Sequence, residues 1–219
     1  MSNILLVDDH AVVRNGVKQI LSDNMDQVTI GEASDSVETV FQLRKKSWDL
    51  MILDIRLPGH SGIDILKKVK SEHPKLPVLM FSTYPESQYA VRLIKAGAAG
   101  YLSKDAEESE ILIAVSAILK GGRYINDVVG GLLADYVDRK ADVNVEEVPH
   151  LALSNREYEI FLHLASGLGP TDIAERLSVS AKTVSTHRSR LLQKMGLSNN
   201  AELTLYAVSY THLTLPTTD

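Results

Sequence analysis

The chain has 219 residues, 44% of them hydrophobic and 23% charged, which is typical of a soluble globular protein with one large or two ordinary domains. It has no cysteine, which excludes a disulfide scaffold, a thiolate zinc site and a cysteine nucleophile. No apolar run approaches the ~18 residues that span a bilayer, and the N-terminus lacks the basic start of a signal peptide. We therefore expect a soluble, cytoplasmic protein with no membrane partner.

The net charge of −5 is distributed unevenly along the chain. Residues 1–122 carry 14 Lys or Arg against 16 Asp or Glu, residues 123–149 carry 3 against 6, and residues 150–219 carry 6 against 6. Within the neutral last part, Ser178–Gly196 holds four basic residues and no acid. Such a local excess can serve phosphate groups although the whole chain is acidic, so nucleic acid stays a candidate partner.

The first half alternates short apolar runs with stretches of helical periodicity. Strands buried on both faces are predicted at Ile4–Val7, Leu50–Leu53 and Val78–Phe81, with weaker candidates at Val28–Ala33 and Tyr101–Leu102. Helices are predicted at Ala11–Leu21, Val37–Lys45, Gly62–Ser71, Ser87–Lys95 and Ala106–Lys120. This alternation indicates an α/β fold, a doubly wound five-stranded parallel sheet with helices on both faces.

The pattern changes after residue 122. Residues 123–149 are acidic and contain a Gly130-Gly131 pair, which predicts a linker with a helical segment in its middle. Residues 150–208 predict an all-α domain of four short helices, the first opened by a capping box of Ser154 and Glu157. The other three are Asp172–Leu177, Ala181–Met195 with Ser180 as its N-cap, and Asn199–Val208. The second and third are joined by only about three residues, the proportions of a helix-turn-helix.

Polar side chains follow the ends of four predicted strands. Asp8 and Asp9 follow the first strand, Asp54 the third, Ser82 and Thr83 the fourth, and Ser103 and Lys104 the fifth. Because parallel strands present their carboxyl ends at one edge of the sheet, these groups should converge. Clustered carboxylates hold Mg²⁺, a carboxylate can form an aspartyl phosphate, and a hydroxyl and a lysine can bind phosphoryl oxygens. The cluster predicts phosphoryl chemistry, although singly Asp8 or Asp9 is explained as a helix cap and Lys104 as a solvated surface charge.

Residues 2–122 resemble the receiver domain of bacterial two-component response regulators. The likeness is carried by Ile-Leu-Leu-Val-Asp8-Asp9-His10, Asp54-Ile-Arg-Leu-Pro58-Gly59, Phe-Ser82-Thr-Tyr and Gly100-Tyr101-Leu-Ser-Lys104. The resemblance implies a flavodoxin-like receiver in which Asp54 accepts a phosphoryl group and Ser82 and Lys104 bind it. It also implies Mg²⁺ held by Asp8, Asp9, Asp54 and the backbone carbonyl of Arg56, and an aromatic switch residue, Tyr101, that turns toward the sheet.

Two other functions compete with that interpretation. A stand-alone phosphatase of the haloacid-dehalogenase type also uses a Mg²⁺-bound aspartate after a buried strand. Its pattern places the nucleophile after the first strand and a second aspartate two positions later, where this chain has His10, and no cap-domain insertion is visible. A phosphorylation-independent transcription factor is the second alternative. A missing acid or lysine would favour it, and none is missing.

Residues 151–208 resemble the LuxR-type helix-turn-helix of the NarL/FixJ family. The likeness is carried by Leu153-Ser-Asn-Arg-Glu157, Asp172-Ile-Ala174-Glu-Arg-Leu177 and Ser180-Ala-Lys-Thr183-Val184-Ser-Thr-His187. It implies that Ala181–Met195 reads the DNA major groove. The predicted DNA contacts are Lys182, Thr183, Ser185, Thr186, His187, Arg188, Ser189 and Arg190. Ser185 is uncharged where lysine is common among relatives, which leaves the base preference open, and a merely solvated basic face is the alternative explanation of the charges.

A helical wheel divides these residues by role. With Val184 at the centre of the buried stripe, Leu191 and Met195 lie within about 20° of it, whereas Lys182, Thr186, Ser189 and Gln193 lie on the opposite side. We predict Lys182 on a phosphate, and Ser185, Thr186, Ser189 and Arg190 nearest to base edges. Arg188 is predicted at the helix edge, reaching outward to the DNA backbone. For His187, packing and phosphate contact stay open.

The complete prediction is a phosphorylation-switched transcription regulator, not an enzyme beyond its own phosphorylation and dephosphorylation. Its parts are a receiver at 1–122, a linker at 123–149, a DNA-binding domain at 150–208 and a tail at 209–219. The expected partners are a sensor histidine kinase, double-stranded DNA, RNA polymerase, and a second copy of the chain when phosphorylated or on DNA. The tail matches neither domain; joined adaptor or vector sequence, which we favour, and a natural disordered end both stay open.

Overall fold

A computed structural model describes residues 2–57, 61–141, 149–177 and 179–209 of the chain. The predicted tail lies outside these residues apart from Ser209. Contacts divide the chain into two compact units, Met1–Tyr136 and Val137–Asp219. Within the described ranges, no helix combines the length and the apolar character needed to cross a membrane.

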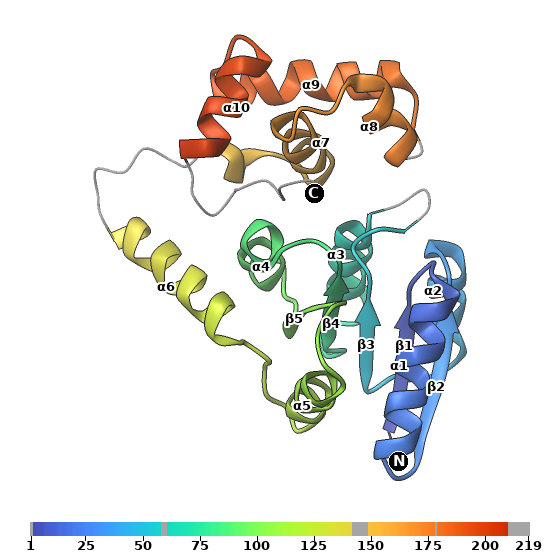
Figure 1. Ribbon diagram of the computed structural model, residues 1–219. Coiled ribbons are helices and arrows are strands. Elements are labelled where there is room, and N and C mark those ends of the chain that lie inside the picture. Colours follow the sequence, from blue (N-terminus) through green and yellow to red (C-terminus); the bar gives the residue numbers. More distant parts are fainter. Residues whose placement is uncertain (1, 58–60, 142–148, 178, 210–219) are drawn as a thin grey trace. The chain divides into compact units, whose positions relative to one another are not determined.

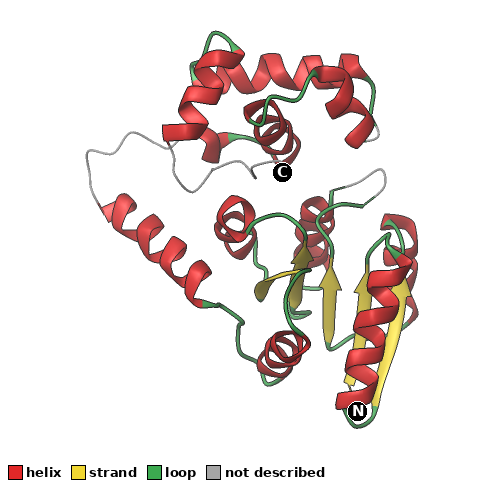
Figure 2. Ribbon diagram, viewed as in Figure 1, coloured by secondary structure: helices red, strands yellow, loops and turns green. Residues whose placement is uncertain are grey.

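The first unit is built on a five-stranded parallel sheet in the order β2-β1-β3-β4-β5 (Figures 1 and 2). Its strands are β1 (Ser2–Val7), β2 (Val28–Ala33), β3 (Leu50–Leu53), β4 (Val78–Ser82) and β5 (Gly100–Ser103). All residues of β3 and β4 are buried, as continuous apolar runs predict for strands covered on both faces. The predicted α/β fold is confirmed. β5 is longer than its apolar pair, because Gly100 and Ser103 continue the pairing with β4.

Five helices cover this sheet. They are α1 (Ala11–Asn24), α2 (Ser36–Lys45), α3 (Gly62–Glu72), α4 (Glu86–Lys95) and α5 (Glu108–Leu119). On one face, α1 and α5 pack against alternate residues of the strands, with Leu21 and Val115 fully buried among them. α3 and α4 lie on the other face (Figure 1). α5 begins two residues later than predicted, because Glu107 has an extended backbone and takes the N-cap position.

A sixth helix, α6 (Asp127–Ala141), follows in the segment predicted as a linker. Asn126 joins it to α4, since its Nδ2 donates to Glu86 Oε1 at 2.7 Å while its Oδ1 accepts from the N–H of Val129. Farther along, Lys95 Nζ donates to the Tyr136 hydroxyl at 2.6 Å. The helical segment is thus longer than the sequence predicts, and the part up to Tyr136 belongs to the first compact unit.

All regular secondary structure among the described residues of the second unit is helical. It contains a short 3₁₀ turn, η1 (Pro149–Ala152), and the helices α7 (Asn155–Ala165), α8 (Pro170–Arg176), α9 (Ala181–Met195) and α10 (Asn200–Ser209). The capping box of α7 and the Ser180 cap of α9 are both confirmed. α8 begins two residues earlier than predicted, because Pro170 takes the first helical position and Asp172 accepts from the N–H of Gly169. Gly196, in the left-handed conformation at φ 67°, ends α9.

Candidate functional site

The acids after β1 and β3 are positioned by a continuation of the sheet. The N–H of Asp8 donates to Ala33 O at 3.1 Å, and the N–H of Asp54 donates to Val7 O at 2.9 Å. Each bond extends the ladder one residue past its strand, so both side chains leave the same edge of the sheet. Both are buried. The structure therefore brings these two acids together as the order of the strands predicts.

Lys104 lies between the two buried carboxylates. Its Nζ is 2.6 Å from Asp8 Oδ2 and 2.7 Å from Asp54 Oδ2, and the side chain is 7% exposed, so it is not a solvated surface lysine. Burial raises the pKa of Asp54, and the charge of Asp8 adds to this effect, whereas Lys104 and a backbone hydrogen bond from Arg56 oppose it. Two buried carboxylates share one ammonium group, which leaves the site short of positive charge.

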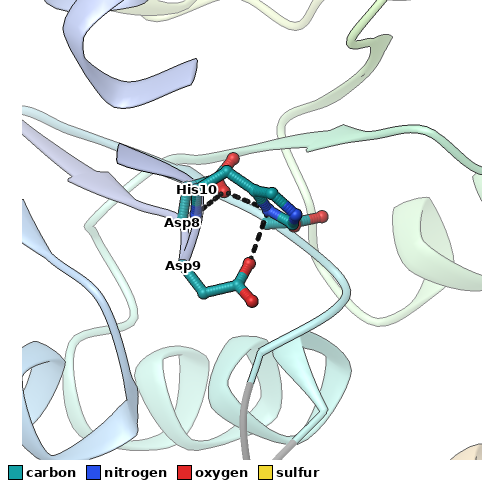
Figure 3. Close-up of side chains that lie close together, drawn as sticks. Asp8, Asp9 and His10 are labelled. Carbon is teal, nitrogen blue, oxygen red and sulfur yellow. Dashed lines mark hydrogen bonds and ion pairs between the residues drawn. The ribbon is translucent and has the colours of Figure 1, made fainter. Parts of the chain in front are cut away.

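Asp9 and His10 complete the cluster and are its more exposed members, with side chains 29% and 46% exposed (Figure 3). The N–H of His10 donates to Asp8 Oδ1 at 2.8 Å, and its Nδ1 lies 2.7 Å from Asp9 Oδ1. His10 itself occupies the N-cap position of α1, without a side-chain capping bond, so neither acid caps that helix. Ligand atoms of Asp8, Asp9, His10 and Asp54 lie within 4.8 Å of one another. Sequence reasoning placed His10 in a motif but gave it no role, because only the fold shows where its ring points.

The clustered carboxylates carry more negative charge than Lys104 can balance, so they suit a divalent cation. Oxygen ligands from one or two carboxylates, completed by water, are what Mg²⁺ prefers. Arg56, whose carbonyl the resemblance to receiver domains assigns to the same ion, is exposed, and its backbone N–H interacts with Asp54. The residues present can therefore hold Mg²⁺ beside Asp54.

Gly62 is required where α3 begins against the loop that follows Asp54. A Cβ built on Gly62 would lie 1.9 Å from Asp54 O, which is a backbone atom that cannot move aside cheaply. The Gly62 N–H donates to Ile55 O at 2.7 Å and fixes the same turn. This close approach of two backbones defines the position of Asp54 relative to α3.

Ser82 and Tyr101 lie on neighbouring strands at the same edge. Ser82 is buried, and its Oγ accepts from the N–H of Tyr84 at 3.3 Å. Tyr101 is fully buried, and its hydroxyl donates to Tyr84 O at 2.6 Å. Burial raises the pKa of Tyr101, so its hydroxyl keeps its proton. The structure thus has the ring of Tyr101 turned inward, while the predicted switching movement stays a prediction.

Two residues at the strand ends do not join the cluster in the way their position suggests. Thr83 is exposed. Ser103 uses its Oγ to accept from the N–H of Asp105 at 3.2 Å, which shapes the turn after β5. The groups at this edge that converge are Asp8, Asp9, His10, Asp54 and Lys104, with Ser82 buried on the neighbouring strand.

The second candidate surface is the outer face of α9. Val184, Leu191 and Met195 are buried as the helical wheel predicts, and Leu192 joins them. The predicted groove-facing residues are all exposed: Lys182, Ser185, Thr186, Ser189, Arg190 and Gln193. Thr183 is half-buried and belongs to the helix cap, with its hydroxyl 2.8 Å from Ser180 Oγ. An exposed polar face with two basic side chains, those of Lys182 and Arg190, suits binding in the major groove of DNA.

Two of the four basic residues counted in the sequence are engaged inside the domain. Lys194 Nζ lies 2.7 Å from Glu157 Oε2, a buried carboxylate in the capping box of α7. Burial works to raise the pKa of Glu157, but hydrogen bonds from Lys194 and Ser154 outweigh it and hold that pKa below its usual value. Arg188 Nε donates to Asn200 Oδ1 at 2.8 Å, which joins α9 to α10. The charge available to a nucleic acid is therefore smaller than the sequence suggests.

His187 combines packing with a free nitrogen. Its side chain is half-buried, and among the described residues no group forms a hydrogen bond with its buried Nδ1. Burial lowers the pKa of His187, so the neutral ring is favoured. Of the two roles left open by the sequence, this environment favours packing.

Comparison with known proteins identifies the family. Residues 4–116 match the response regulator receiver domain, and residues 151–207 match the bacterial regulatory proteins of the luxR family. The chain belongs to the response regulators of the NarL/FixJ family.

The relatives of this response regulator span nearly its whole length. It is 32% identical to response regulator UvrY of Escherichia coli strain K12 over 96% of this chain and 95% of the relative. It is 34% identical to oxygen regulatory protein NreC of Staphylococcus haemolyticus over 94% and 96%. The two domains therefore occur together in its relatives in the same order.

Solved structures show the same architecture. RcsB of Salmonella enterica serovar Typhimurium, bound to promoter P1flhDC in the presence of the phosphomimetic BeF₃⁻, is 25% identical with a TM-score of 0.59, over 96% of this chain and 98% of that one. A LuxR-family response regulator of Aurantimonas sp. SI85-9A1 is 28% identical with a TM-score of 0.58, over 63% and 99%. The RcsB match spans the receiver fold and the helical domain that follows it, whereas the Aurantimonas match spans only part of this chain.

Proposed function

We propose that this response regulator is a transcription regulator of the cytoplasm that is switched by phosphorylation of Asp54. The observation that carries the proposal is the pairing of one ammonium, Lys104, with two buried carboxylates, of which Asp54 is one. A sensor histidine kinase is the proposed donor, and promoter DNA and RNA polymerase are the proposed partners of the second domain.

The chain's own residues supply the parts of a phosphotransfer. A carboxylate oxygen of Asp54 attacks the phosphorus of a phosphohistidine; the new P–O bond forms as the P–N bond breaks, and the histidine nitrogen leaves and takes up a proton. Lys104 then releases Asp8 and binds the phosphoryl oxygens, and the hydroxyl of Ser82 donates to the same group. Mg²⁺ held by Asp8 and Asp9 supplies neutralisation of the phosphoryl charge when it is bound.

The output is proposed to be a dimer on DNA. Among the solved structures of similar fold are two RcsB dimers bound to two parallel DNAs, at 25% identity and a TM-score of 0.58. The exposed face of α9, with Lys182 and Arg190, is the surface we propose for the major groove. The hydroxyl of Tyr101 donates to Tyr84 O, in the segment that follows Ser82. Tyr101 is the proposed switch that couples the Asp54 site to this face of α9.

Chemical labelling tests the phosphoacceptor. The full chain is incubated with Mg²⁺ and acetyl phosphate, and the adduct is located by mass spectrometry. We expect one phosphoryl group on Asp54, lost in Asp54→Asn and after chelation of Mg²⁺, and retained in the exposed-acid control Asp23→Asn. Wild-type labelling of Asp54→Asn contradicts the proposal, and repeated turnover to free phosphate without a stable adduct favours the phosphatase alternative.

A further inference from the structure

The exposed face of α9 carries three side-chain hydroxyls whose protons are already engaged. Ser185 Oγ donates to Ala181 O at 3.0 Å, and Ser189 Oγ donates to Ser185 O at 3.1 Å. Thr186 Oγ1 donates to Lys182 O at 2.9 Å. Each bond reaches back four residues to a helix carbonyl, as serine and threonine do inside helices. Because a hydroxyl has one proton, each exposed oxygen offers only lone pairs to a further partner.

This arrangement favours one direction of hydrogen bonding with a ligand. A group that donates to Ser185 Oγ adds a hydrogen bond and leaves the bond to Ala181 O in place. A group that accepts from Ser185 must first break that bond, so that one hydrogen bond is exchanged for another with little net gain. The same holds for Thr186 and Ser189. The three hydroxyls therefore suit a ligand that presents hydrogen-bond donors.

Few other side chains on this face can accept a hydrogen bond. α9 contains no Asp or Glu. Its exposed polar side chains besides the hydroxyls are three cations, which have no acceptor atom, and one amide: Lys182, Arg190, Lys194 and Gln193. Gln193 lies in the last turn of the helix, whereas the hydroxyls lie nearer its start. Before Gln193, the hydroxyls are thus the acceptors that the exposed face of α9 offers.

A base pair presents one amino group and one carbonyl oxygen in the major groove. The amino group belongs to adenine or cytosine, and the carbonyl oxygen belongs to thymine or guanine. An acceptor held over one strand therefore favours adenine or cytosine there over guanine or thymine. Ser185 and Ser189 are four residues apart, about 6 Å along the helix axis, which is close to two base-pair steps of about 3.4 Å. We therefore expect them to face different base pairs.

We propose that Ser185, Thr186 and Ser189 are specificity-determining residues that accept hydrogen bonds from the amino groups of adenine or cytosine. Their selection is opposite in direction to that of Arg190, which can only donate and so suits the O6 and N7 of guanine. The base preference of this chain is then set by hydroxyl acceptors as well as by a basic side chain. The inference rests on the proposed binding of α9 in the major groove.

Selection from randomised DNA locates the base pairs concerned. The full chain, with Mg²⁺ and beryllofluoride, selects binders from a library of randomised duplexes. Ser185→Ala, Thr186→Val and Ser189→Ala should each lose discrimination at one base pair of the enriched motif. Ser166→Ala, which removes an exposed hydroxyl bonded to a backbone carbonyl at the end of α7, is the matched control and should keep the motif. An unchanged motif in all three α9 variants overturns the proposal.

Deletion of single groups from the DNA then tests the direction of the hydrogen bond. At the pair that Ser185→Ala relaxes, the amino group is removed by replacing adenine with purine or cytosine with 2-pyrimidinone. This should weaken binding of the wild type by about two- to tenfold more than binding of Ser185→Ala, the usual net effect of one hydrogen bond. Ser189→Ala is tested at its own pair in the same way.

Removal of the carbonyl oxygen from the same pair is the control on the DNA side. Thymine is replaced with 5-methyl-2-pyrimidinone or guanine with 2-aminopurine, and the wild type and Ser185→Ala should be weakened alike. A loss that depends on Ser185 when the carbonyl oxygen is removed, and not when the amino group is removed, means that the hydroxyl donates and overturns the proposal.

The inference and the proposed function fail in different ways. If the full chain enriches a motif but the hydroxyls couple to carbonyl oxygens or to no base, DNA binding stands and the assignment of acceptors is wrong. If no motif is enriched with or without beryllofluoride, the proposed reading of DNA by α9 is wrong and the inference falls with it.

Discussion

At the scale of single residues, two lysines of α9 that look alike in the sequence have different environments. Lys182 is exposed at the start of the helix, whereas Lys194 near its end pairs with the buried Glu157 at 2.7 Å. A lysine that contacts a DNA phosphate releases a counterion, and one committed to an internal carboxylate does not. The structure therefore separates an exposed charge, that of Lys182, from a charge that is paired inside the domain, that of Lys194.

The first prediction compares these lysines in a DNA-binding assay over a range of salt. Lys182→Ala should weaken binding to all sequences alike and lower the slope of log affinity against log salt by about one. Lys194→Ala should leave the slope unchanged and lower the thermal stability of the helical domain. Arg190→Ala should cost about 1–3 kcal/mol on the cognate site and little on random DNA. A full unit of slope lost in Lys194→Ala would place that residue on DNA instead.

The second prediction concerns the pH dependence of the Glu157 pair. The pKa of Glu157 is lowered in the folded chain, so the carboxylate stabilises the fold above its unfolded pKa, near 4.5, and that stability is lost as the pH falls through the lower, folded pKa. Glu157→Gln should lower the free energy of unfolding at pH 7 by about 1–3 kcal/mol, the range for a hydrogen bond to a charged group.

Denaturant unfolding measured from pH 7 down to acid checks this prediction. The difference between wild type and Glu157→Gln should shrink as the pH falls below about 4.5, the usual pKa of a glutamate side chain. Glu175→Gln, an exposed acid on α8, is the control and should show little difference at any pH. A difference in unfolding free energy between wild type and Glu157→Gln that is independent of pH would mean that the shape of the Glu157 side chain, not its charge, stabilises the fold.

At the scale of elements, the start of α3 and the middle of α1 make different demands on a glycine. A Cβ on Gly62 would meet Asp54 O at 1.9 Å, whereas a Cβ on Gly16, in α1, would meet nothing within 4 Å. Both glycines lie in helices, and neither needs a positive φ. The difference is that a backbone oxygen of another segment lies beside Gly62, whereas no other segment lies beside Gly16 among the described residues.

The third prediction follows from this contrast. Gly16→Ala should stabilise the chain by about 0.5–1 kcal/mol, because alanine is the better helix former and restricts the unfolded chain. Gly62→Ala should destabilise it by about 1–3 kcal/mol or more, because the clash is with backbone. It should also reduce acetyl phosphate labelling, because Asp54 moves. Thermal unfolding and labelling of both variants check this, and a Gly62→Ala chain as stable and as reactive as wild type would contradict the close approach.

At the scale of the whole molecule, the proposed function requires that a chemical event in one compact unit change the DNA affinity of the other. The first unit extends through Tyr136 and includes most of α6, which Glu86 and Lys95 of α4 hold through Asn126 and Tyr136. α4 follows the Ser82–Tyr84 segment that contacts Tyr101. Lys104 joins Asp54 to this segment, since its Nζ donates to Asp54 Oδ2 at 2.7 Å and its N–H donates to Ser82 O at 2.9 Å. Hydrogen bonds and the chain itself thus connect Asp54 to α4 and the start of α6.

The fourth prediction measures that coupling. Beryllofluoride with Mg²⁺ should raise the affinity of the full chain for its DNA site by about 5–150-fold, the usual range for coupled sites. Asp54→Asn should abolish the increase and leave basal binding in place. Fluorescence anisotropy with a labelled duplex checks this, with Asp23→Asn as the control that keeps the response. Equal affinity with and without beryllofluoride would favour a phosphorylation-independent regulator.

The sequence by itself determined the features that depend on local pattern. Apolar runs located β1, β3 and β4, periodicity located the helices, and the Ser154–Glu157 capping box and Ser180 marked two helix starts that the structure confirms. The order of strands and helices also predicted that Asp8 and Asp54 share one edge, because parallel strands end on the same side. These inferences need only neighbours along the chain and the general geometry of a parallel sheet.

Only the tertiary structure decided which side chains meet across long separations. Lys104 lies 50 residues from Asp54, and Lys194 lies 37 residues from Glu157, yet each pair is 2.7 Å apart. The direction of the His10 ring, the inward position of Tyr101 and the contacts of α6 with α4 were decided in the same way. Periodicity reports which face of an element is buried, whereas the partner on that face depends on how loops and packing bring distant elements together.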